Sequence, residues 1–181
     1  MPPQFGGLDY EHSISPLETG NLDQKNENAD LIRTVSRHSL AYVLCSISEL
    51  FRHYKFDPVD LLIIHAVLNA NVLNVMKDPD LDREYGSVHR AEPDTIKQGV
   101  SRGTLSRFLN LPEETIRRRA NGLKAQGILA EREDGLIVTE NNQFKFGNNH
   151  ELQRTNIVFV RKLLKDLARA GVRGPDDLTF S

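Results

Sequence analysis

GVSRGTLSRFLNLPEETIRRRANGLKAQGILAEREDGLIV, residues 99–138, contains two helix starts, a tight turn and a helix stop in close succession. Ser101 can cap a short helix, and Asn110-Leu111 predicts the tight turn that follows it. Pro112 suits the first position of a second helix because it has no N–H to lose there. Gly127 favours the left-handed conformation that ends a helix. The stretch therefore predicts two helices joined by a turn.

A β-hairpin is predicted directly after the second helix. Glu133-Asp134-Gly135 separates the runs 129–132 and 136–138, and Asp-Gly between apolar runs is a strong short-range hairpin signal. We also expect a short strand over 96–100 that pairs with this hairpin. The order helix, turn, helix, hairpin is that of a winged helix-turn-helix. The predicted fold class is therefore mainly α with a small β hairpin (α+β).

The second helix separates an apolar side from a side that carries base-reading groups. At about 100° per residue, its inward side collects Ile116, Ala120 and Leu123. Arg118, Asn121 and Glu114 face outward, and these residue types can bond guanine, adenine and cytosine edges respectively. A charged helix face is most often only solvated. Three consecutive arginines, residues 117–119, favour a nucleic-acid contact instead, because the second helix of such a unit enters the major groove.

The segment LSRFLNLPEETIRRRANGLKAQGIL, residues 105–129, resembles the winged-helix reading units of bacterial transcription regulators. It is similar to the multiple-antibiotic-resistance (MarR) family and to the C-terminal domain of the Crp/Fnr family. The matching positions are Leu105, Leu109 and Leu111, the pair Thr115-Ile116, and the ending Leu123, Gly127 and Ile128. The resemblance implies that Glu113, Glu114, Arg117 and Arg118 are directed at base edges or neighbouring phosphates.

The predicted DNA-contacting residues combine this helix with its surroundings. Arg118 and Asn121 are expected to read bases, and Glu114 to select cytosine or orient an arginine. The basic and hydroxyl side chains around them are expected to hold phosphates. Arg132 is the basic hairpin residue available to a minor groove. The full predicted set is Ser101, Arg102, Thr104, Glu113, Glu114, Thr115, Arg117, Arg118, Asn121, Lys124 and Arg132.

Long amphipathic helices are predicted on both sides of this reading unit. Apolar residues at three- and four-residue steps predict helices over 29–54, 57–76 and 151–170. Phe144 and Phe146 are expected to tuck under the helices. The residues before 99 show no strand period, which favours the MarR family over Crp/Fnr proteins, whose reading unit follows a β-barrel. The MarR resemblance implies a homodimer made by the first and last helices.

Composition divides the chain into an acidic arm, one domain and a tail. The 181 residues are 39% hydrophobic and carry a net charge of −2. Residues 1–28 are polar and acidic, which predicts a disordered arm. Residues 78–94 hold two arginines against six carboxylates and form an acidic connection that the MarR pattern lacks. We expect a single domain over 29–172, with dimerisation helices at 29–77 and 149–172, a reading unit at 95–147, and a tail at 173–181.

Catalytic and metal chemistry find little support in the sequence. Asp78, Asp80 and Asp82 imitate the start of a calcium loop, but Arg83 replaces the required glycine and His89 the bidentate glutamate. Paired carboxylates, a glycine-rich phosphate loop and a nucleophile beside a base are all missing from the pattern. We therefore expect neither an enzyme nor a bound cofactor or metal.

The cellular compartment is predicted from the cysteine count and the hydropathy. A single cysteine fits a reducing compartment. We find no signal-peptide pattern and no stretch long and apolar enough to cross a bilayer, so the predicted localisation is cytoplasmic. The cysteine, Cys45, is expected to act as a small hydrophobe near the core. His65 is expected to be a hydrogen-bonded core histidine.

The predicted function is a sequence-specific regulator that binds double-stranded DNA as a homodimer on a pseudo-palindromic site. The resemblance implies that such a dimer represses transcription by occupying a promoter. The alternative is a winged-helix module that binds a protein partner, which the acidic hairpin tip would suit. No membrane partner is expected. The sequence leaves open whether a small-molecule effector enters a cleft between the dimer helices and the reading unit.

Overall fold

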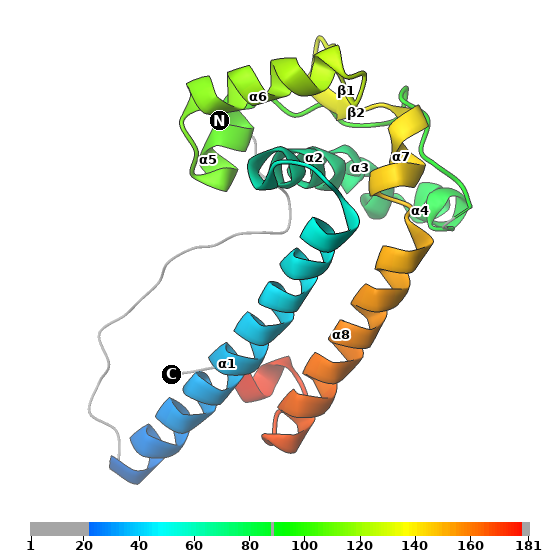
Figure 1. Ribbon diagram of the computed structural model, residues 1–181. Coiled ribbons are helices and arrows are strands. Elements are labelled where there is room, and N and C mark those ends of the chain that lie inside the picture. Colours follow the sequence, from blue (N-terminus) through cyan, green and yellow to red (C-terminus); the bar gives the residue numbers. More distant parts are fainter. Residues whose placement is uncertain (1–21, 88, 179–181) are drawn as a thin grey trace. The chain divides into compact units, whose positions relative to one another are not determined.

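The computed structural model describes residues 22–87 and 89–178, which form a mainly helical fold with a two-stranded antiparallel sheet (Figure 1). The predicted fold class is confirmed at this level, mainly α with a small β hairpin. In chain order the elements are α1 (Leu22–His53), α2 (Pro58–Asn71), α3 (Leu73–Lys77), α4 (Pro79–Tyr85), α5 (Arg102–Leu109), α6 (Glu113–Ala125), β1 (Leu129–Arg132), β2 (Gly135–Val138), α7 (Glu140–Phe146), α8 (His150–Arg169) and the 3₁₀ helix η1 (Pro175–Leu178).

The described residues fall into two compact units instead of the single domain expected over 29–172. The central unit is Tyr54–His150, and the two-helix unit consists of residues 22–53 and 151–178. The periodicity of a helix identifies its apolar side but does not say which element covers that side. The sequence grouped 29–77 with 149–172 as dimerisation helices, whereas residues 54–77 belong to the central unit.

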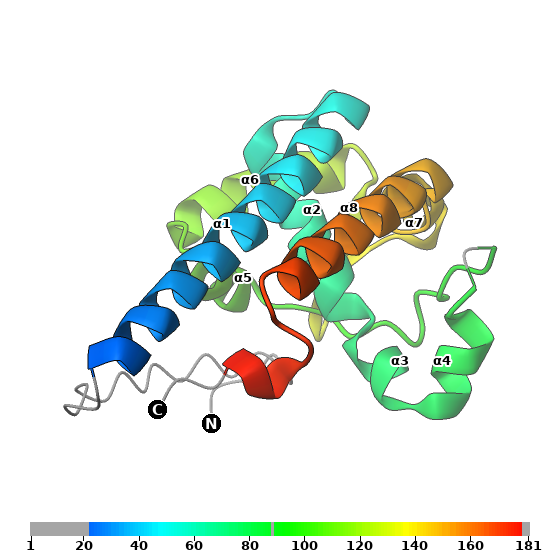
Figure 2. The same cartoon turned by 90° about the horizontal axis from the view of Figure 1, so that it is seen from below.

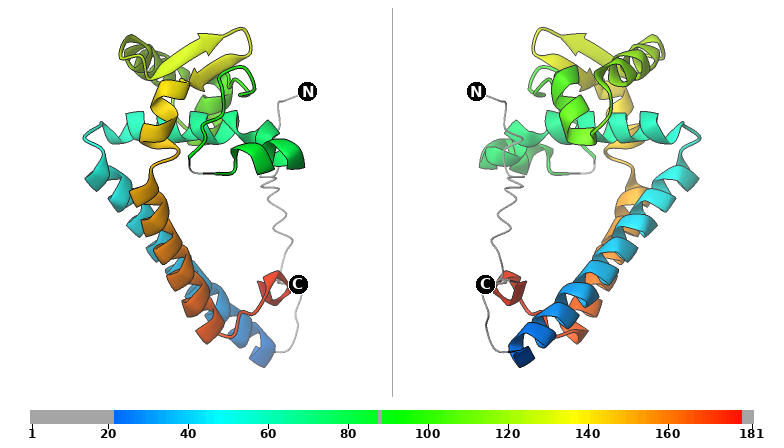
Figure 3. Two further views of the ribbon diagram at one scale, coloured as in Figure 1. Left: turned by 90° about the vertical axis from the view of Figure 1, so that its right-hand side faces the viewer. Right: turned by 90° about the vertical axis from the view of Figure 1, so that its left-hand side faces the viewer.

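α2 is the main core helix of the central unit, as its nearly continuous apolar sequence predicts. The Asp57 carboxylate caps it by accepting a hydrogen bond from the Val59 N–H at 2.9 Å. α2 contacts α5, α6 and β2, and passes beneath α6 and the hairpin in Figure 1, as the further views in Figure 3 also show. The fully buried apolar side chains of this core include Leu61, Ile63, Ile64, Val67, Leu105, Ile116, Leu123, Leu136, Ile137 and Val138.

The segment 58–77 is, by length and composition alone, apolar enough to cross a membrane. This corrects the expectation that no stretch of the chain would qualify. Half of that segment is buried inside the protein. Within it, His65 Nδ1 lies 2.8 Å from the Leu61 carbonyl oxygen, and burial lowers the pKa of the imidazole. The hydrogen-bonded core histidine expected from the sequence is confirmed.

The helix predicted over 57–76 is interrupted at Val72, so that α3 is a separate element. Before the interruption lies Asn71, a fully buried amide inside the apolar core. Its Nδ2 donates to the Gln98 carbonyl at 2.7 Å, and its Oδ1 accepts from the Val138 N–H at 2.9 Å. Asn71 therefore ties the end of α2 to two later backbone segments.

The connection predicted over 78–94 contains a helix, α4, that the sequence analysis missed. The Asp78 carboxylate caps α4 by accepting from the Asp80 N–H at 3.0 Å and from the Leu81 N–H at 3.3 Å. Asp-Pro followed by an acidic first turn is also how α2 starts, at Asp57-Pro58. α3 and α4 pack side by side (Figure 2).

The hairpin pairs β1 with β2 in antiparallel register, with Arg132 opposite Gly135. Its two-residue turn is therefore Glu133-Asp134, one residue earlier than an Asp-Gly turn. Gly135 has a φ of +130°, and a Cβ at this position would lie 2.5 Å from the carbonyl carbon of Val100. Only glycine accommodates both the positive φ and this close approach.

The outer edge of β2 is covered by residues that precede α5. Val100 forms a bridge with Leu136, exchanging hydrogen bonds of 3.1 and 2.9 Å. Lys97 Nζ, which is fully buried, donates to the Val138 carbonyl at 2.8 Å. The strand predicted over 96–100 is thus wrong except at Val100, because side chains rather than backbone groups cover the rest of this edge.

α7 follows the hairpin, in a segment for which no helix was predicted. Phe146 is buried as expected, 5.0 Å from the Tyr54 ring and 5.7 Å from the Phe56 ring, centroid to centroid. The Tyr54 hydroxyl donates to the Lys145 carbonyl, and burial raises the pKa of Tyr54 to about 12. Phe144 is exposed, contrary to expectation. Two residues apart on a helix, Phe144 and Phe146 point about 200° apart.

α1 begins at Leu22, so residues 22–28 are helical although the sequence analysis placed them in a disordered arm. Extending an existing helix costs far less than nucleating one, and the long amphipathic segment that follows supplies the nucleus. Residues 1–21 of the predicted arm lie outside the described residues.

α1 and α8 run side by side in opposite directions in the two-helix unit (Figures 1 and 3). The Tyr42 hydroxyl donates to Asn156 Oδ1 at 3.1 Å, and His38 Nδ1 lies 3.7 Å from an Asp166 carboxylate oxygen. α8 ends at Arg169, one residue before the predicted end at 170, and Gly171 follows with a φ of +92°.

Many large apolar side chains of the two-helix unit remain exposed. They are Ile32, Leu40, Val43, Leu44, Phe51, Ile157, Val158 and Leu164. Cys45 is also exposed, which corrects the expectation that it packs near a core. The tail predicted at 173–181 contains the 3₁₀ helix η1, which the Asp177 carboxylate supports by accepting from the Arg173 N–H at 2.6 Å and the Gly174 N–H at 3.0 Å.

Candidate nucleic-acid interface

α5, the following turn and α6 fix the orientation of the candidate reading helix. Ser101 caps α5 by accepting from the Thr104 N–H at 3.1 Å, and Asn110 makes the turn in the left-handed conformation with a φ of 50°. Pro112 is the residue before α6 rather than its first helical residue, one position outside the prediction. Gly127, with a φ of +71°, follows α6 as predicted.

α6 buries one side and exposes the other. The side chains on its inner side, with no exposed surface, are Ile116, Ala120 and Leu123. The exposed polar side chains on the opposite side and its flank, called here the outer face of α6, are Glu114, Arg117, Arg118 and Asn121. The inner set and the outward positions of Glu114, Arg118 and Asn121 are those expected from the helical period, and Arg117 lies on the flank. Contacts of α6 with α2, α5 and β1 hold the inner side in place.

Arg118 and Asn121 are the two unengaged polar side chains of the outer face. They lie three residues apart and therefore project from the same side of the helix. Within the described residues, neither side chain has a hydrogen bond or an ion pair. Both groups are consequently available to a ligand without first breaking an internal contact.

Arg117 and Glu114 form a two-point ion pair along the same helix. Arg117 Nε lies 2.7 Å from Glu114 Oε2, and Nη2 lies 2.6 Å from Oε1. The hydrogen bond from Arg117 lowers the pKa of Glu114, and the same bond raises the pKa of Arg117. Of the two roles expected for Glu114, the geometry fits the one that orients an arginine.

Glu131 on β1 engages two cations that the sequence analysis assigned to phosphates. Arg102 at the start of α5 donates through both terminal nitrogens, with Nη2 at 2.9 Å from Oε2, and Lys124 near the end of α6 donates to the same carboxylate. Hydrogen bonds from Arg102 and then Lys124 lower the pKa of Glu131 to about 2. The carboxylate joins α5, α6 and the hairpin, and it neutralises part of the positive charge there.

Arg132 is held by neighbours of its own hairpin and of the preceding connection. Its Nη1 donates to the Asp94 carbonyl, and its Nε and Nη2 lie 3.1 and 3.2 Å from the Asp134 carboxylate oxygens. The basic residue predicted for a minor groove is therefore paired with the acidic hairpin tip.

Arg119, the third of the consecutive arginines, is a structural residue. Its Nη2 lies 3.1 Å from an Asp57 oxygen, and its Nη1 lies 3.4 Å from an Asp60 oxygen. The Val59 N–H lowers the pKa of the Asp57 carboxyl, whereas burial raises the pKa of Asp60. This cluster ties α6 to the start of α2, so Arg119, one of the three consecutive arginines that favoured a nucleic-acid contact, faces inward.

The two hydroxyl residues expected on phosphates are occupied by the cap of α5. Thr104 is 7% exposed, and its Oγ1 lies 2.9 Å from Ser101 Oγ. This corrects the prediction for Thr104, because a buried methyl and a paired hydroxyl cannot reach the backbone of a duplex. Of the other predicted residues, Glu113 is exposed and Thr115 is half-buried.

Arg107 is an exposed cation near the candidate interface that the sequence analysis did not single out. It lies in the last turn of α5, and its Nη2 is 3.4 Å from Thr104 Oγ1. Its place two residues before the end of α5, next to the turn that leads into α6, could have marked it as a phosphate contact. Neither Arg107 nor Arg118 forms an ion pair with a carboxylate within the described residues, although the charge of Arg118 contributes to the lowered pKa of Glu114.

Metal binding finds no support in the part of the chain that the structure describes, where no group of three or more His, Cys, Asp or Glu side chains could hold an ion.

No protein-family model, curated protein or solved structure matches this chain. What the outer face of α6 binds must therefore be inferred from its own residues.

Proposed function

We propose that this chain is a sequence-specific DNA-binding regulator in which a winged helix-turn-helix, built by α5, α6 and the β1–β2 hairpin, presents α6 to a major groove. The observation that carries the proposal is the pair Arg118 and Asn121, which are exposed on one side of α6 and form no hydrogen bond or ion pair among the described residues. A solvated helix face would be served equally well by any polar residues. Arginine and asparagine are the residue types that read purine edges through two hydrogen bonds each.

The proposed division of labour follows from which side chains are engaged. Arg118 reads a guanine through O6 and N7, and Asn121 reads an adenine through N6 and N7. Arg117, oriented by Glu114, and Arg107 contact phosphates on either side of the groove. These contacts require no rearrangement of the described structure.

Arg102 and Lys124 contribute to phosphate binding through an exchange. Each is paired with Glu131 in the unbound chain. On binding, a phosphate oxygen can replace the Glu131 carboxylate as the acceptor. Each cation then loses one hydrogen-bond partner and gains another. Non-specific affinity is then set partly by Glu131 rather than by the number of basic residues alone.

A homodimer of two such chains is the proposed binding species. The exposed apolar side chains of α1 and α8 supply a surface that a second copy would cover. Two-fold symmetry then requires an inverted repeat whose half-site centres lie about 10 bp apart or a multiple of that. The MarR resemblance supports repression by promoter occupation. In this proposal the dimer acts in the cytoplasm and needs no cofactor.

The experiment that tests the proposal is selection of bound sequences from a random duplex pool by the full chain. The selected duplex is then compared with a scrambled duplex across a salt series. We expect an inverted repeat, a specificity ratio of roughly 10³ or more, and a steep loss of affinity with salt. A pool that shows no enrichment would contradict the proposal.

Protein binding by the same surface is the second candidate. The observation in its favour is that carboxylates neutralise Arg102, Lys124 and Arg132. In that case charge reversal of Arg117 and Arg118 would abolish capture of a partner protein, and neither the original chain nor the variant would bind duplex DNA.

A further inference from the structure

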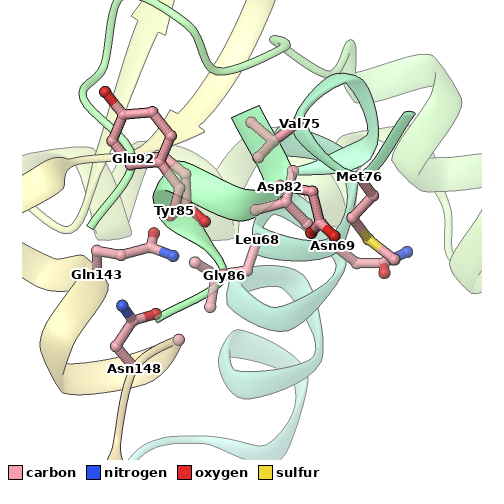
Figure 4. A pocket seen from close by; sticks show the side chains of 12 residues that line it. Leu68, Asn69, Val75, Met76, Asp82, Tyr85, Gly86, Glu92, Gln143 and Asn148 are labelled. Atoms are coloured by element: carbon pink, nitrogen blue, oxygen red, sulfur yellow. The ribbon is translucent and has the colours of Figure 1, made fainter. Parts of the chain in front are cut away.

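A pocket of about 240 Å³ lies inside the central unit, away from the outer face of α6. It is bounded by α2, α3, α4, the segment after α4, and α7 (Figure 4). The amide side chains of Gln143 and Asn148 lie on one side of the view in Figure 4, and Asp82, Met76 and Asn69 lie on the other. The pocket thus depends on α4, which belongs to the acidic segment that the MarR pattern lacks.

Two buried hydrogen-bond acceptors line this pocket without a donor. Glu92 is 7% exposed and Gln143 is 3% exposed. Glu92 Oε2 and Gln143 Oε1 are both inaccessible to solvent and have no hydrogen-bond partner among the described residues. Buried polar atoms are nearly always paired, because leaving one unpaired costs the full desolvation of the group. The two atoms indicate that a donor is supplied from outside the chain.

The charge of the lining identifies the kind of donor. Asp82 and Glu92 are its two carboxylates, and the lining includes no lysine, arginine or histidine. Arg90 lies over the Tyr85 ring at 5.8 Å, but its guanidinium pairs with Glu84 at 3.3 Å. The negative charge of the pocket is therefore not balanced by its own lining residues.

Apolar and aromatic groups complete the wall. Leu68, Val72, Val75 and Met76 come from α2, α3 and the residue between them. Tyr85 adds an aromatic ring to the wall, and Arg90 lies over this ring. Ligand pockets commonly combine such an apolar wall with a few convergent polar groups that fix orientation.

We infer that this pocket binds a small organic cation, an amine or amidine attached to a compact apolar group. The cation pairs with the Asp82 carboxylate, which is exposed to the pocket, and a shift of the Glu92 and Gln143 side chains opens Glu92 Oε2 and Gln143 Oε1 to its N–H groups. The apolar part rests against Val75 and Met76. The inference does not depend on DNA binding, because the residues involved are separate from the outer face of α6.

The test is titration of the full chain with benzamidine, followed by calorimetry or by NMR shifts of backbone amides. Benzyl alcohol and benzoate serve as neutral and anionic probes of similar size. We expect saturable binding of benzamidine, binding of benzyl alcohol at least about tenfold weaker, and no detectable binding of benzoate. Equal binding of the cation and the anion would overturn the inference, as would no saturable binding of benzamidine.

Two carboxamide variants locate the site. Glu92→Gln and Asp82→Asn should each weaken benzamidine binding, Glu92→Gln by about tenfold or more. Asp82 is exposed, so Asp82→Asn keeps the test valid if Glu92→Gln fails to fold. Asp80→Asn is the matched control, because Asp80 lies on the same helix outside the pocket and should leave the affinity unchanged. Unaltered affinity in both Asp82→Asn and a folded Glu92→Gln would place the binding elsewhere and contradict the inference.

Discussion

Replacing Asn71 by alanine should be among the most destabilising single changes in the central unit. The amide is fully buried and bonds three backbone groups: the Gln98 carbonyl at 2.7 Å, the Leu136 carbonyl at 3.3 Å and the Val138 N–H at 2.9 Å. The Leu136 carbonyl keeps a second donor, the Val100 N–H at 3.1 Å. Two backbone groups, at Gln98 and Val138, would lose the partner that Asn71 provides.

The magnitude follows from these two orphaned groups. A buried donor or acceptor left unpaired costs about 1–3 kcal/mol, so the two groups orphaned by Asn71→Ala should lower the free energy of unfolding by about 2–6 kcal/mol. In the hairpin, residue pairs that exchange hydrogen bonds alternate with pairs that do not, counting from the pair Arg132 and Gly135. The Val138 N–H therefore points away from β1 and cannot find a new partner within the sheet.

Urea unfolding followed by circular dichroism measures this change. Asn69→Ala is the matched control, because Asn69 lies on the same helix but is exposed. Its effect should stay within about 0.5 kcal/mol. A loss below about 1 kcal/mol for Asn71→Ala, or equal losses for the two variants, would refute the view that a buried amide holds the hairpin on α2.

Three further changes probe the hairpin and its charges. Gly135→Ala should destabilise the protein by more than about 2 kcal/mol, because residue 135 has a positive φ and a Cβ there would touch the Val100 backbone. Gly122→Ala should stabilise α6 by up to about 1 kcal/mol, because the space around a Cβ at residue 122 is open. Thermal melts measure both changes. Glu131→Gln should raise the affinity for random duplex, because it frees Arg102 and Lys124 to contact phosphates. The slope of log affinity against log salt concentration should then become steeper by up to about 2. An unchanged slope in a filter-binding assay would count against the replacement of Glu131 by phosphate. The pKa of Glu131 is lowered from 4.5 to about 2. The stability that Glu131 contributes should therefore be present above about pH 4.5 and be lost as the pH falls towards 2. A stability difference between the original chain and Glu131→Gln that persists at pH 2 would contradict this expectation.

The elements of the central stretch could be predicted because their signals are local. A capping serine, a left-handed Asn110, and Gly127 and Gly135 at positive φ each act within a few residues. The helical period likewise identified the buried and exposed sides of α6. α4 was missed although Asp78-Pro79 carries the same signal as Asp57-Pro58, because a polar segment rich in charge was interpreted as a connection.

Long-range pairings could not be predicted from the pattern. Nothing local indicates that Glu131 joins Arg102 to Lys124, that Arg119 turns inward to Asp57, or that Lys97 is buried. A lysine or asparagine flanked in the sequence by apolar residues is only a weak signal of a buried polar contact, because the same pattern occurs at residues that prove to be exposed. Charge counting alone therefore overestimated the number of cations free to meet a phosphate.

The most direct test of base reading by α6 is the affinity of the Arg118→Ala variant for the selected duplex and for a scrambled duplex, measured at one salt concentration. Lys124→Ala is the comparison, because a phosphate contact should weaken both duplexes alike. We predict that Arg118→Ala loses about 1–3 kcal/mol on the selected duplex and much less on the scrambled one, with relaxed preference at one base pair. Equal losses on the two duplexes would show that Arg118 does not read a base, and would contradict the proposed role of this helix.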